Sequence, residues 1–155
     1  GLLKLIALDS DDLAVVSTHL QDAEVKVGEI HWRPREKRVV IGLDRFDWEA
    51  ANGQKPTFQR CRSALRFERV MACRCRNVLS QDKDKALNLL GVEFSEVNSP
   101  GGTVTLMFAG GEALRLEVEC LEAEVVDLGP VWAADCCPDH AEDAAPEVKS
   151  QSGRA

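Results

Sequence analysis

The sequence contains no tyrosine, and aromatic residues make up only 5% of its 155 residues. Any core must therefore be built mainly from leucine, valine and alanine. The sequence also lacks an apolar run of the roughly 18 residues that a membrane-spanning helix needs, and its short apolar start is followed at once by acidic residues. We therefore expect a cytoplasmic protein with no signal peptide and no membrane span.

Motifs of the common catalytic classes are missing as well. The sequence has no HExxH, no GxSxG and no glycine pattern of a nucleotide-binding loop. Gly101-Gly102 and Gly110-Gly111 stand between apolar-alternating segments, where paired glycines are typical of hairpin turns. The sequence thus gives no reason to expect a cofactor, and it favours a protein that is not an enzyme.

The length and composition predict a single globular domain. A chain of about 150 residues buries roughly 68–70% of its unfolded surface, which allows a core of useful size. The contents of 45% hydrophobic and 29% charged residues are ordinary for a globular protein. After Trp132 the sequence becomes polar and rich in alanine and proline, as disordered segments often are. We expect one domain over residues 1–132 and a disordered polar tail over residues 133–155.

The spacing of apolar residues predicts one helix and a series of strands. A short strand over residues 4–8 leads to Asp9, which can cap a helix that continues to about Asp22. Period-two alternation and turn residues predict further strands over residues 25–33, 38–48, 58–78, 87–96, 103–108 and 114–120. Leu121, Val125 and Leu128 have helical spacing, so a short C-terminal helix is expected, with a continued strand as the alternative.

Together these elements predict an α+β fold with a mostly antiparallel sheet of six or seven strands. By analogy alone, such an order fits a pleckstrin-homology-like barrel or an open two-layer sandwich. The strand over residues 58–78 alternates apolar residues with arginines, and only Arg69 breaks the alternation. A kink or bulge is therefore expected at Arg69.

Three segments together resemble a known family: LKLIALDSDDLAVVSTHLQDAEVKVGE, RSALRFERV and PGGTVTLMFAGGEALRLEVECLEAEVVDLG. They are similar to an uncharacterised alphaproteobacterial family, domain of unknown function 2948, over residues 2 to about 132. The shared motifs are structural: a helix cap, a hairpin and a passage from strand to helix. The resemblance implies a bacterial cytoplasmic protein, and it brings no catalytic residues.

The six cysteines raise the question of a metal or thiol site. Cys73 and Cys75 share a parity in the strand over residues 58–78, while Cys136, Cys137 and His140 follow in the tail. Structural zinc sites usually present C-x₂₋₄-C on turns, which is not the spacing here. We therefore expect no metal, and we interpret Cys73 and Cys75 as reduced, inward-facing and unreactive. A role for the tail cysteines stays open.

Charge is distributed unevenly along the chain. The net charge is −7, yet the segment from His31 to Arg76 holds 12 basic and 5 acidic residues, a balance of +7. Even-numbered positions of the strand over residues 58–78 place arginines on one face, and further arginines gather at a neighbouring turn. Arginine binds carboxylates and phosphates well. The candidate binding residues are Arg60, Arg62, Arg66, Arg74, Arg76, Arg33, Arg35 and Arg38.

Three interpretations of this arginine-rich face compete. The protein's own acids, including the acidic run over residues 117–124, can neutralise a solvated face. Alternatively the face binds another protein or a second copy, as in a homodimer. An anionic small molecule is a third possibility, and nucleic acid is disfavoured because few aromatic residues lie nearby and the net charge is negative. We favour a small non-enzymatic interaction protein; the alternative is an enzyme or regulator that binds a small anionic ligand or nucleotide on the same face.

Overall fold

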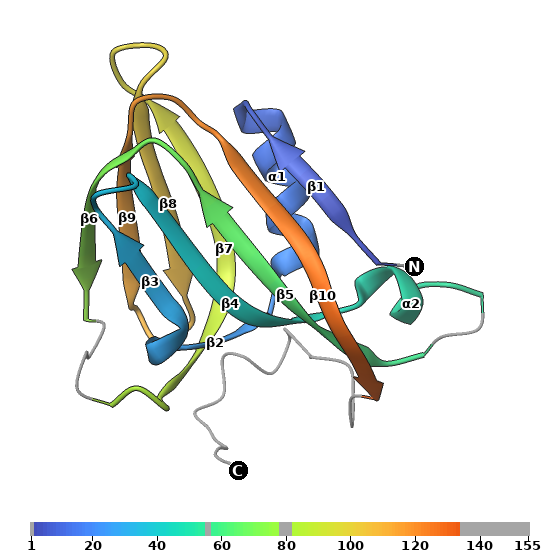
Figure 1. Ribbon diagram of the computed structural model, residues 1–155. Helices are drawn as coiled ribbons and strands as arrows, with labels where there is room; N and C mark the ends of the chain where they lie inside the picture. Colours follow the sequence, from blue (N-terminus) through green and yellow to red (C-terminus); the bar gives the residue numbers. More distant parts are fainter. Residues whose placement is uncertain (1, 55–56, 78–81, 134–155) are drawn as a thin grey trace.

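The computed structural model describes residues 2–54, 57–77 and 82–133. These residues form ten strands in one open sheet, together with two α-helices and a 3₁₀ turn over Val27–Glu29 (Figure 1). Every strand pair in the sheet is antiparallel. The expected α+β class with a mostly antiparallel sheet is confirmed, with more strands than the six or seven expected.

The sheet has two parts that share a core. One part contains β1 (Lys4–Ala7), β10 (Ala123–Ala133), β5 (Gln59–Phe67), β4 (Arg38–Phe46) and β3 (Ile30–Arg33). The other contains β2 (Glu24–Lys26), β7 (Ala86–Glu96), β8 (Gly102–Phe108), β9 (Ala113–Val118) and β6 (Val70–Arg76). Strand β2 pairs with both β4 and β7 and so joins the parts. The order β1-β10-β5-β4-β2-β7-β8-β9-β6 leaves β1 and β6 as end strands, and β3 lies beside β4.

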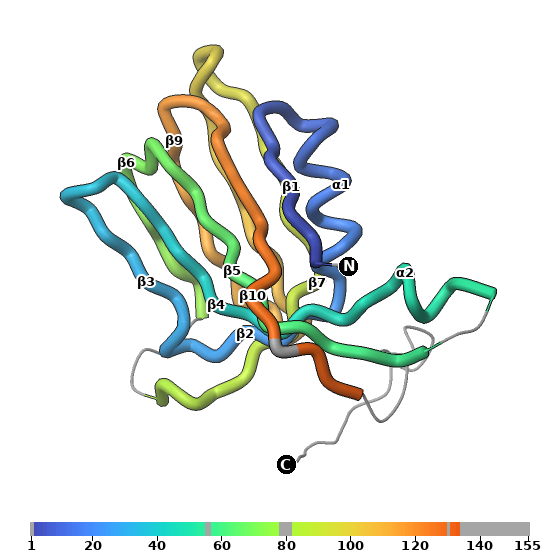
Figure 2. The backbone as a smooth tube through the Cα atoms, turned by 45° about the vertical axis from the view of Figure 1, so that its right-hand side comes forward, coloured from blue at the N-terminus to red at the C-terminus, as the bar shows by residue number. Residues whose placement is uncertain are grey.

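A bend at Arg69 carries the β5–β10 pair into the β6–β9 pair. Arg69 has a φ of +58°, in the left-handed region that non-glycine residues rarely adopt. The ladder stays connected through the bend, because Glu68 N–H donates to the Glu122 carbonyl (2.9 Å) and Glu119 N–H donates to the Arg69 carbonyl (3.0 Å). The expected single strand over residues 58–78 is therefore two strands in different parts of the sheet. The two parts face each other across the core (Figures 1 and 2).

Helix α1 (Ser10–Leu20) covers the core beside β7 and β1 (Figure 1). Asp9 caps it, since the Asp9 carboxylate accepts a hydrogen bond from Asp12 N–H (2.8 Å). The apolar stripe of Leu13, Val16 and Leu20 is buried as its spacing predicts. The expected helix is thus confirmed, with its last residue two positions earlier than expected. No helix in the described ranges is long and apolar enough to cross a membrane.

Three local expectations are wrong. The expected C-terminal helix is instead β10, because β10 lies between β1 and β5 and its backbone groups are bonded on both sides. Leu121, Val125 and Asp127 face the core at period two, while Leu128 is exposed. The expected strand over residues 25–33 is interrupted by the 3₁₀ turn, and the strand expected over residues 38–48 ends at Phe46, with helix α2 (Trp48–Ala51) after it.

A buried ion pair closes one end of the core. Arg45 and Asp127 are each about 95% buried and form two hydrogen bonds, Nε to Oδ1 at 2.7 Å and Nη2 to Oδ2 at 2.6 Å. Asp127 also accepts hydrogen bonds from the Ser63 hydroxyl (2.6 Å) and from Leu3 N–H (2.7 Å). Burial by itself raises the pKa of Asp127, but the bonds from Arg45 and Ser63 outweigh it and lower this pKa to about 2. The pair therefore fastens the start of the chain to β10.

Candidate functional site

The structure separates the eight candidate arginines into two groups. Arg60, Arg62 and Arg66 lie on β5, and Arg38 joins them from the adjacent strand β4. Arg74 and Arg76 lie on β6, the end strand on the other side of the bend. Arg33 lies opposite Arg38 on β3, and Arg35 lies in the turn between β3 and β4. The arginines therefore do not form one stripe on one strand.

Three arginines of the β5 group, Arg38, Arg62 and Arg66, are neutralised by acids of the same protein. Arg66 bridges Glu68 (2.8 Å) and Glu124 (2.7 Å). Glu68 also accepts a hydrogen bond from Arg38 Nε (2.8 Å), and Lys4 lies 3.7 Å from Glu124. Both glutamates are largely covered, so these charge-assisted bonds are stronger than ordinary surface pairs. Arg38 and Arg66 are thus held in place rather than left open for a ligand.

Arg62 is engaged in the same way. Its guanidinium contacts Glu29 at 2.8 Å and Asp44 at 3.3 Å. Burial lowers the pKa of Arg62, but the hydrogen bonds to Asp44 and Glu29 outweigh this effect, and the pKa is raised. The pair passes over Gly42, where a Cβ atom would lie 2.5 Å from Glu29 Oε1 and 2.7 Å from Arg62 Nη2. A glycine at this position of β4 gives the ion pair its space.

Arg60 has a structural role. Its Nη1 donates to the carbonyls of Asp22 (3.3 Å) and Asp44 (3.0 Å), and its guanidinium lies 5.8 Å from the centre of the Phe46 ring. Phe46 also packs edge-on against Trp48, with ring centres 4.8 Å apart. The aromatic residues of this segment thus pack on one another and on Arg60.

The acidic run over residues 117–124 is also paired. Besides Glu124, its members contact basic residues of three different segments, with Glu117–Arg74 at 3.1 Å, Glu119–Lys37 at 3.9 Å and Glu122–Arg69 at 3.4 Å. The side chains of these three glutamates are about 45% exposed. Pairs this exposed contribute little to stability, on the order of 0–1 kcal/mol each. The run is therefore a counter-charge to the arginines rather than an isolated solvated patch.

A charged cleft of about 440 Å³ lies at the bend. Two of its residues have left-handed backbones, Lys37 with φ +52° and Arg69 with φ +58°, and Val70 N–H donates to the Lys37 carbonyl (2.9 Å). Four basic and four acidic residues line the cleft: Lys37, Arg38, Arg66, Arg69, Glu36, Glu68, Glu119 and Glu122. Because the charges balance, a polyanionic ligand would meet as many carboxylates as cations.

The second group differs, because only Arg74 among its four members is paired in the described ranges, with Glu117. Within the described residues, no ion pair involves Arg33, Arg35, Arg76 or Arg115. Arg115 was not among the candidates; it lies on β9 directly opposite Arg74. The sequence places Arg115 on the polar face of a strand over residues 113–118, because apolar and charged residues alternate there. It gives no signal that this strand, β9, pairs with β6. Strands β3 and β6 both lie on the left of Figure 1, and each pairs with one described neighbour.

The cysteines are only partly as expected. Cys73 is half-buried and packs against the core, as expected of an inward-facing residue, whereas Cys75 is exposed. A register shift between Val70 and Ala72 also turns Met71 outward, with 51% of its surface exposed. Burial, and secondarily the neighbouring Cys75 thiol, raises the pKa of Cys73 to about 11. The interpretation of both thiols as buried is therefore wrong for Cys75.

No group of three or more potential metal ligands occurs within residues 2–54, 57–77 and 82–133. Cys136, Cys137 and His140 lie outside the residues that the structure describes.

The two thiols of β6 should differ in reactivity. A pKa of about 11 leaves roughly one Cys73 thiol in a thousand ionised at pH 8, and only the thiolate reacts. We expect iodoacetamide to alkylate the exposed Cys75 at least about tenfold faster than Cys73, as followed by peptide mass spectrometry. The buried Cys61 serves as the control, since it should react only after unfolding. Faster labelling of Cys73 than of Cys75 would contradict the described geometry of β6.

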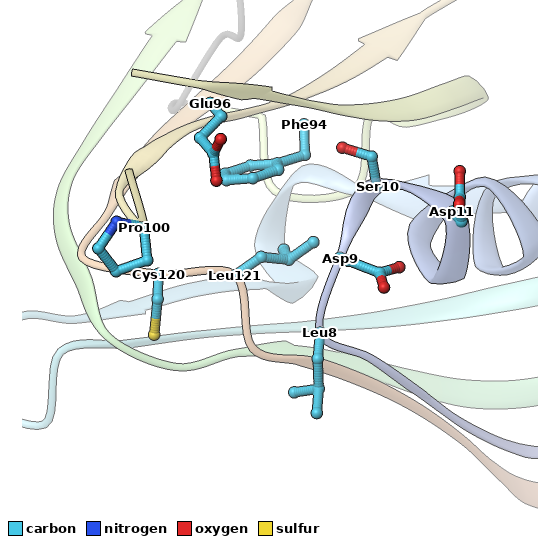
Figure 3. A pocket seen from close by; sticks show the side chains of 9 residues that line it. All are labelled: Leu8, Asp9, Ser10, Asp11, Phe94, Glu96, Pro100, Cys120 and Leu121. Carbon is cyan, nitrogen blue, oxygen red and sulfur yellow. The ribbon is translucent and has the colours of Figure 1, made fainter. Parts of the chain in front are cut away.

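A second cavity, of about 320 Å³, lies at the start of α1 (Figure 3). It is lined by Leu8, Asp9, Ser10 and Asp11 at the start of α1, by Phe94 and Glu96 of β7, and by Pro100, Cys120 and Leu121. Three of the lining residues are acidic and none is basic, so the cavity does not suit an anion. The Asp9 carboxylate already accepts a bond from the helix, and no histidine lines the cavity to activate Cys120.

The fold and surface define a small α+β domain with a bent antiparallel sheet and a strongly charged outer face. The chain matches the family described as Protein of unknown function (DUF2948) over residues 3–140, and it belongs to that family. The match continues past β10 into the first residues of the expected tail. No curated protein and no solved structure matches the chain.

Proposed function

We propose that this chain is a small non-enzymatic interaction module that binds a protein partner on the side of β3, β6 and β9. One observation carries the proposal: Arg38, Arg45, Arg62 and Arg66 of β4 and β5 are paired with acids of the same protein, whereas Arg33, Arg35, Arg76 and Arg115 have no acidic partner among the described residues. Arg60, also on β5, is held by the Asp22 and Asp44 carbonyls. Exposed arginines of this kind orient and select partners that carry carboxylates.

The same observation moves the proposed surface away from β5. A ligand that bound Arg62 or Arg66 would first have to displace Glu29, Asp44, Glu68 or Glu124 from short contacts. The balanced charge of the cleft at the bend weakens the case for a small anionic ligand or nucleotide in the same way. We therefore propose a protein partner rather than a phosphate-bearing molecule.

The proposed setting is the cytoplasm, as expected from the sequence. The four described cysteines are all free thiols, which suits a reducing compartment.

Charge reversal on this side should abolish partner binding. We expect the full chain, immobilised and exposed to extract of its native host, to retain specific proteins that the variant Arg33→Glu/Arg76→Glu does not retain. The matched control is Lys4→Glu on β1, at the opposite end of the strand order, which should retain the same proteins. Quantitative mass spectrometry of the bound fraction measures the result, and thermal melts verify that both variants fold.

Equal retention by the double variant and the wild type would remove β3 and β6 from the binding surface. If Arg62→Gln/Arg66→Gln loses the retained proteins while Arg33→Glu/Arg76→Glu keeps them, the binding surface lies on β5. A metabolite that raises the melting temperature while no protein is retained would favour the small anionic ligand.

A further inference from the structure

The open edge of β6 is well placed to accept an extended peptide. Strand β6 has seven residues and stands at one end of the strand order, and among the described strands it pairs only with β9. The first of these residues, Val70, already donates its N–H to the Lys37 carbonyl (2.9 Å), so the edge considered is that of residues 71–76. An end strand presents main-chain N–H and C=O groups on its open side, and these can pair with another chain. At the other end of the order, β1 has only four residues and α1 packs against it. Of these two end strands, β6 is the longer, and within residues 2–54, 57–77 and 82–133 it is the less covered.

The charges around β6 define which chain fits there. Arg74 and Arg76 are exposed on β6, and Arg115 lies directly opposite Arg74 on β9. Like charges directly opposite each other are unfavourable in a sheet. Within this group Glu117 supplies one carboxylate, at 3.1 Å from Arg74, against three arginines. Acidic side chains on an added strand would relieve this excess of positive charge.

The other face of β6 sets a second requirement. Side chains of an added strand alternate between the two faces of the sheet. On one face they would meet Arg74 and Arg76, and on the other they would meet Cys73 and Cys75, of which Cys73 packs against the core. We propose that β6 accepts, as an additional strand, an extended segment of a partner protein in which acidic and small apolar residues alternate. This inference rests on the proposed interaction function and names the partner's chemistry.

A second copy of the chain fits this edge poorly. Pairing β6 with β6 of another copy would bring the arginines of both strands together, and this like-charge contact opposes assembly. The same arginines that oppose self-pairing favour an acidic strand.

The test uses the full chain and a defined probe. The probe is an acetylated and amidated nonapeptide, Glu-Val-Asp-Ala-Glu-Val-Asp-Ala-Glu, added at low salt to ¹⁵N-labelled protein. We expect amide chemical-shift changes centred on residues 71–76, and at least about tenfold slower hydrogen exchange of their open-side amides. A peptide with Lys at every acidic position should not bind. A peptide N-methylated at alternate residues keeps the charge but cannot complete the ladder, and it should bind at least about tenfold more weakly.

Protein variants test the same site. Arg74→Glu/Arg76→Glu should weaken peptide binding at least about tenfold, and Lys4→Glu should leave it unchanged. If the double charge reversal fails to fold, Arg74→Gln/Arg76→Gln replaces it, with a smaller loss of affinity expected.

Three outcomes would overturn strand addition at β6. If the N-methylated peptide binds as tightly as the unmodified one, the peptide docks by charge alone. The proposed interaction function would still hold in that case. A second outcome is that the peptide does not bind, while proteins are still retained from extract in a way that depends on Arg33 and Arg76. This result would support the proposed interaction function but exclude strand addition at β6. Protection of residues 71–76 that grows with protein concentration in the absence of peptide would identify a second copy as the occupant.

Discussion

Replacing Asp127 with alanine is expected to lower the free energy of unfolding by about 3–5 kcal/mol, because it leaves the buried Arg45 without its counter-ion. A domain of this kind has a total stability of about 5–15 kcal/mol, so a large fraction is at stake. Urea unfolding followed by circular dichroism measures the change. Asp127→Asn keeps the shape of the side chain and should lose less, which keeps the test usable if the alanine variant does not fold.

The matched control for this prediction is Glu122→Ala. Glu122 pairs with Arg69 at 3.4 Å, but both side chains are about half exposed, and the expected loss is below about 1 kcal/mol. A loss for Asp127→Ala as small as that of the control would show that the buried pair does not hold β1 to β10.

The same pair predicts a defined dependence on pH. The pKa of Asp127 is about 2 in the folded protein, against an ordinary value of 3.8, so the charged form is favoured by folding. This contribution, roughly 2–3 kcal/mol, is complete well above pH 4 and is lost as the pH falls towards 2. The difference in stability between the wild type and Asp127→Asn should therefore shrink between pH 5 and pH 2.

The second large effect is expected for Phe67→Ala. Phe67 is completely buried at the end of β5, where it lies opposite Val39 of β4 and Ala123 of β10. Removing a buried phenylalanine leaves a cavity and costs about 3–5 kcal/mol. The effect should be large here because Phe67 packs next to the bend, where the two parts of the sheet are held together. Calorimetric and urea-induced unfolding both measure it.

Phe58→Ala is the control of the same size. Phe58 is 40% exposed and stacks on Phe46 at a ring distance of 6.4 Å, so its removal leaves no closed cavity. We expect a loss of about 1 kcal/mol or less for this variant. Similar losses for Phe67→Ala and Phe58→Ala would mean that the core relaxes around the bend.

Local patterns were sufficient for the helix and for most strands. Asp9 and the stripe of Leu13, Val16 and Leu20 predicted α1, because capping and helical spacing are properties of neighbouring residues. Residues 121–128 show where such patterns fail. The spacing of Leu121 and Val125 fits a helix and a strand equally well. The segment is a strand because the backbone of β10 pairs with both β1 and β5.

The candidate site shows a similar division. The sequence predicted a concentration of arginines with Arg69 as a break, and both are present. Neutralisation by the protein's own acids, including the run that contains Glu124, was one of the three interpretations, and Glu124 does pair with Arg66. The sequence did not reveal which arginines are paired or the parts of Glu29, Asp44 and Glu68, because these acids come from three other segments. Nor could it show that Arg115 lies opposite Arg74, since strand pairing across the bend depends on the whole fold.

By itself the sequence determined the class of fold, the position of the helix, the uneven charge and the family, because each depends on composition or on residues close together in the chain. Only the tertiary structure decided which arginines are neutralised, that Arg45 and Asp127 form a buried pair, and that Cys75 is exposed although it shares a parity with Cys73. The ion pairs join residues that are far apart in the sequence, so only the fold brings them together. For Cys75 the physical reason is the bend at Arg69. It moves the second half of one apolar-alternating strand to the end of the sheet, where fewer neighbours cover its side chains.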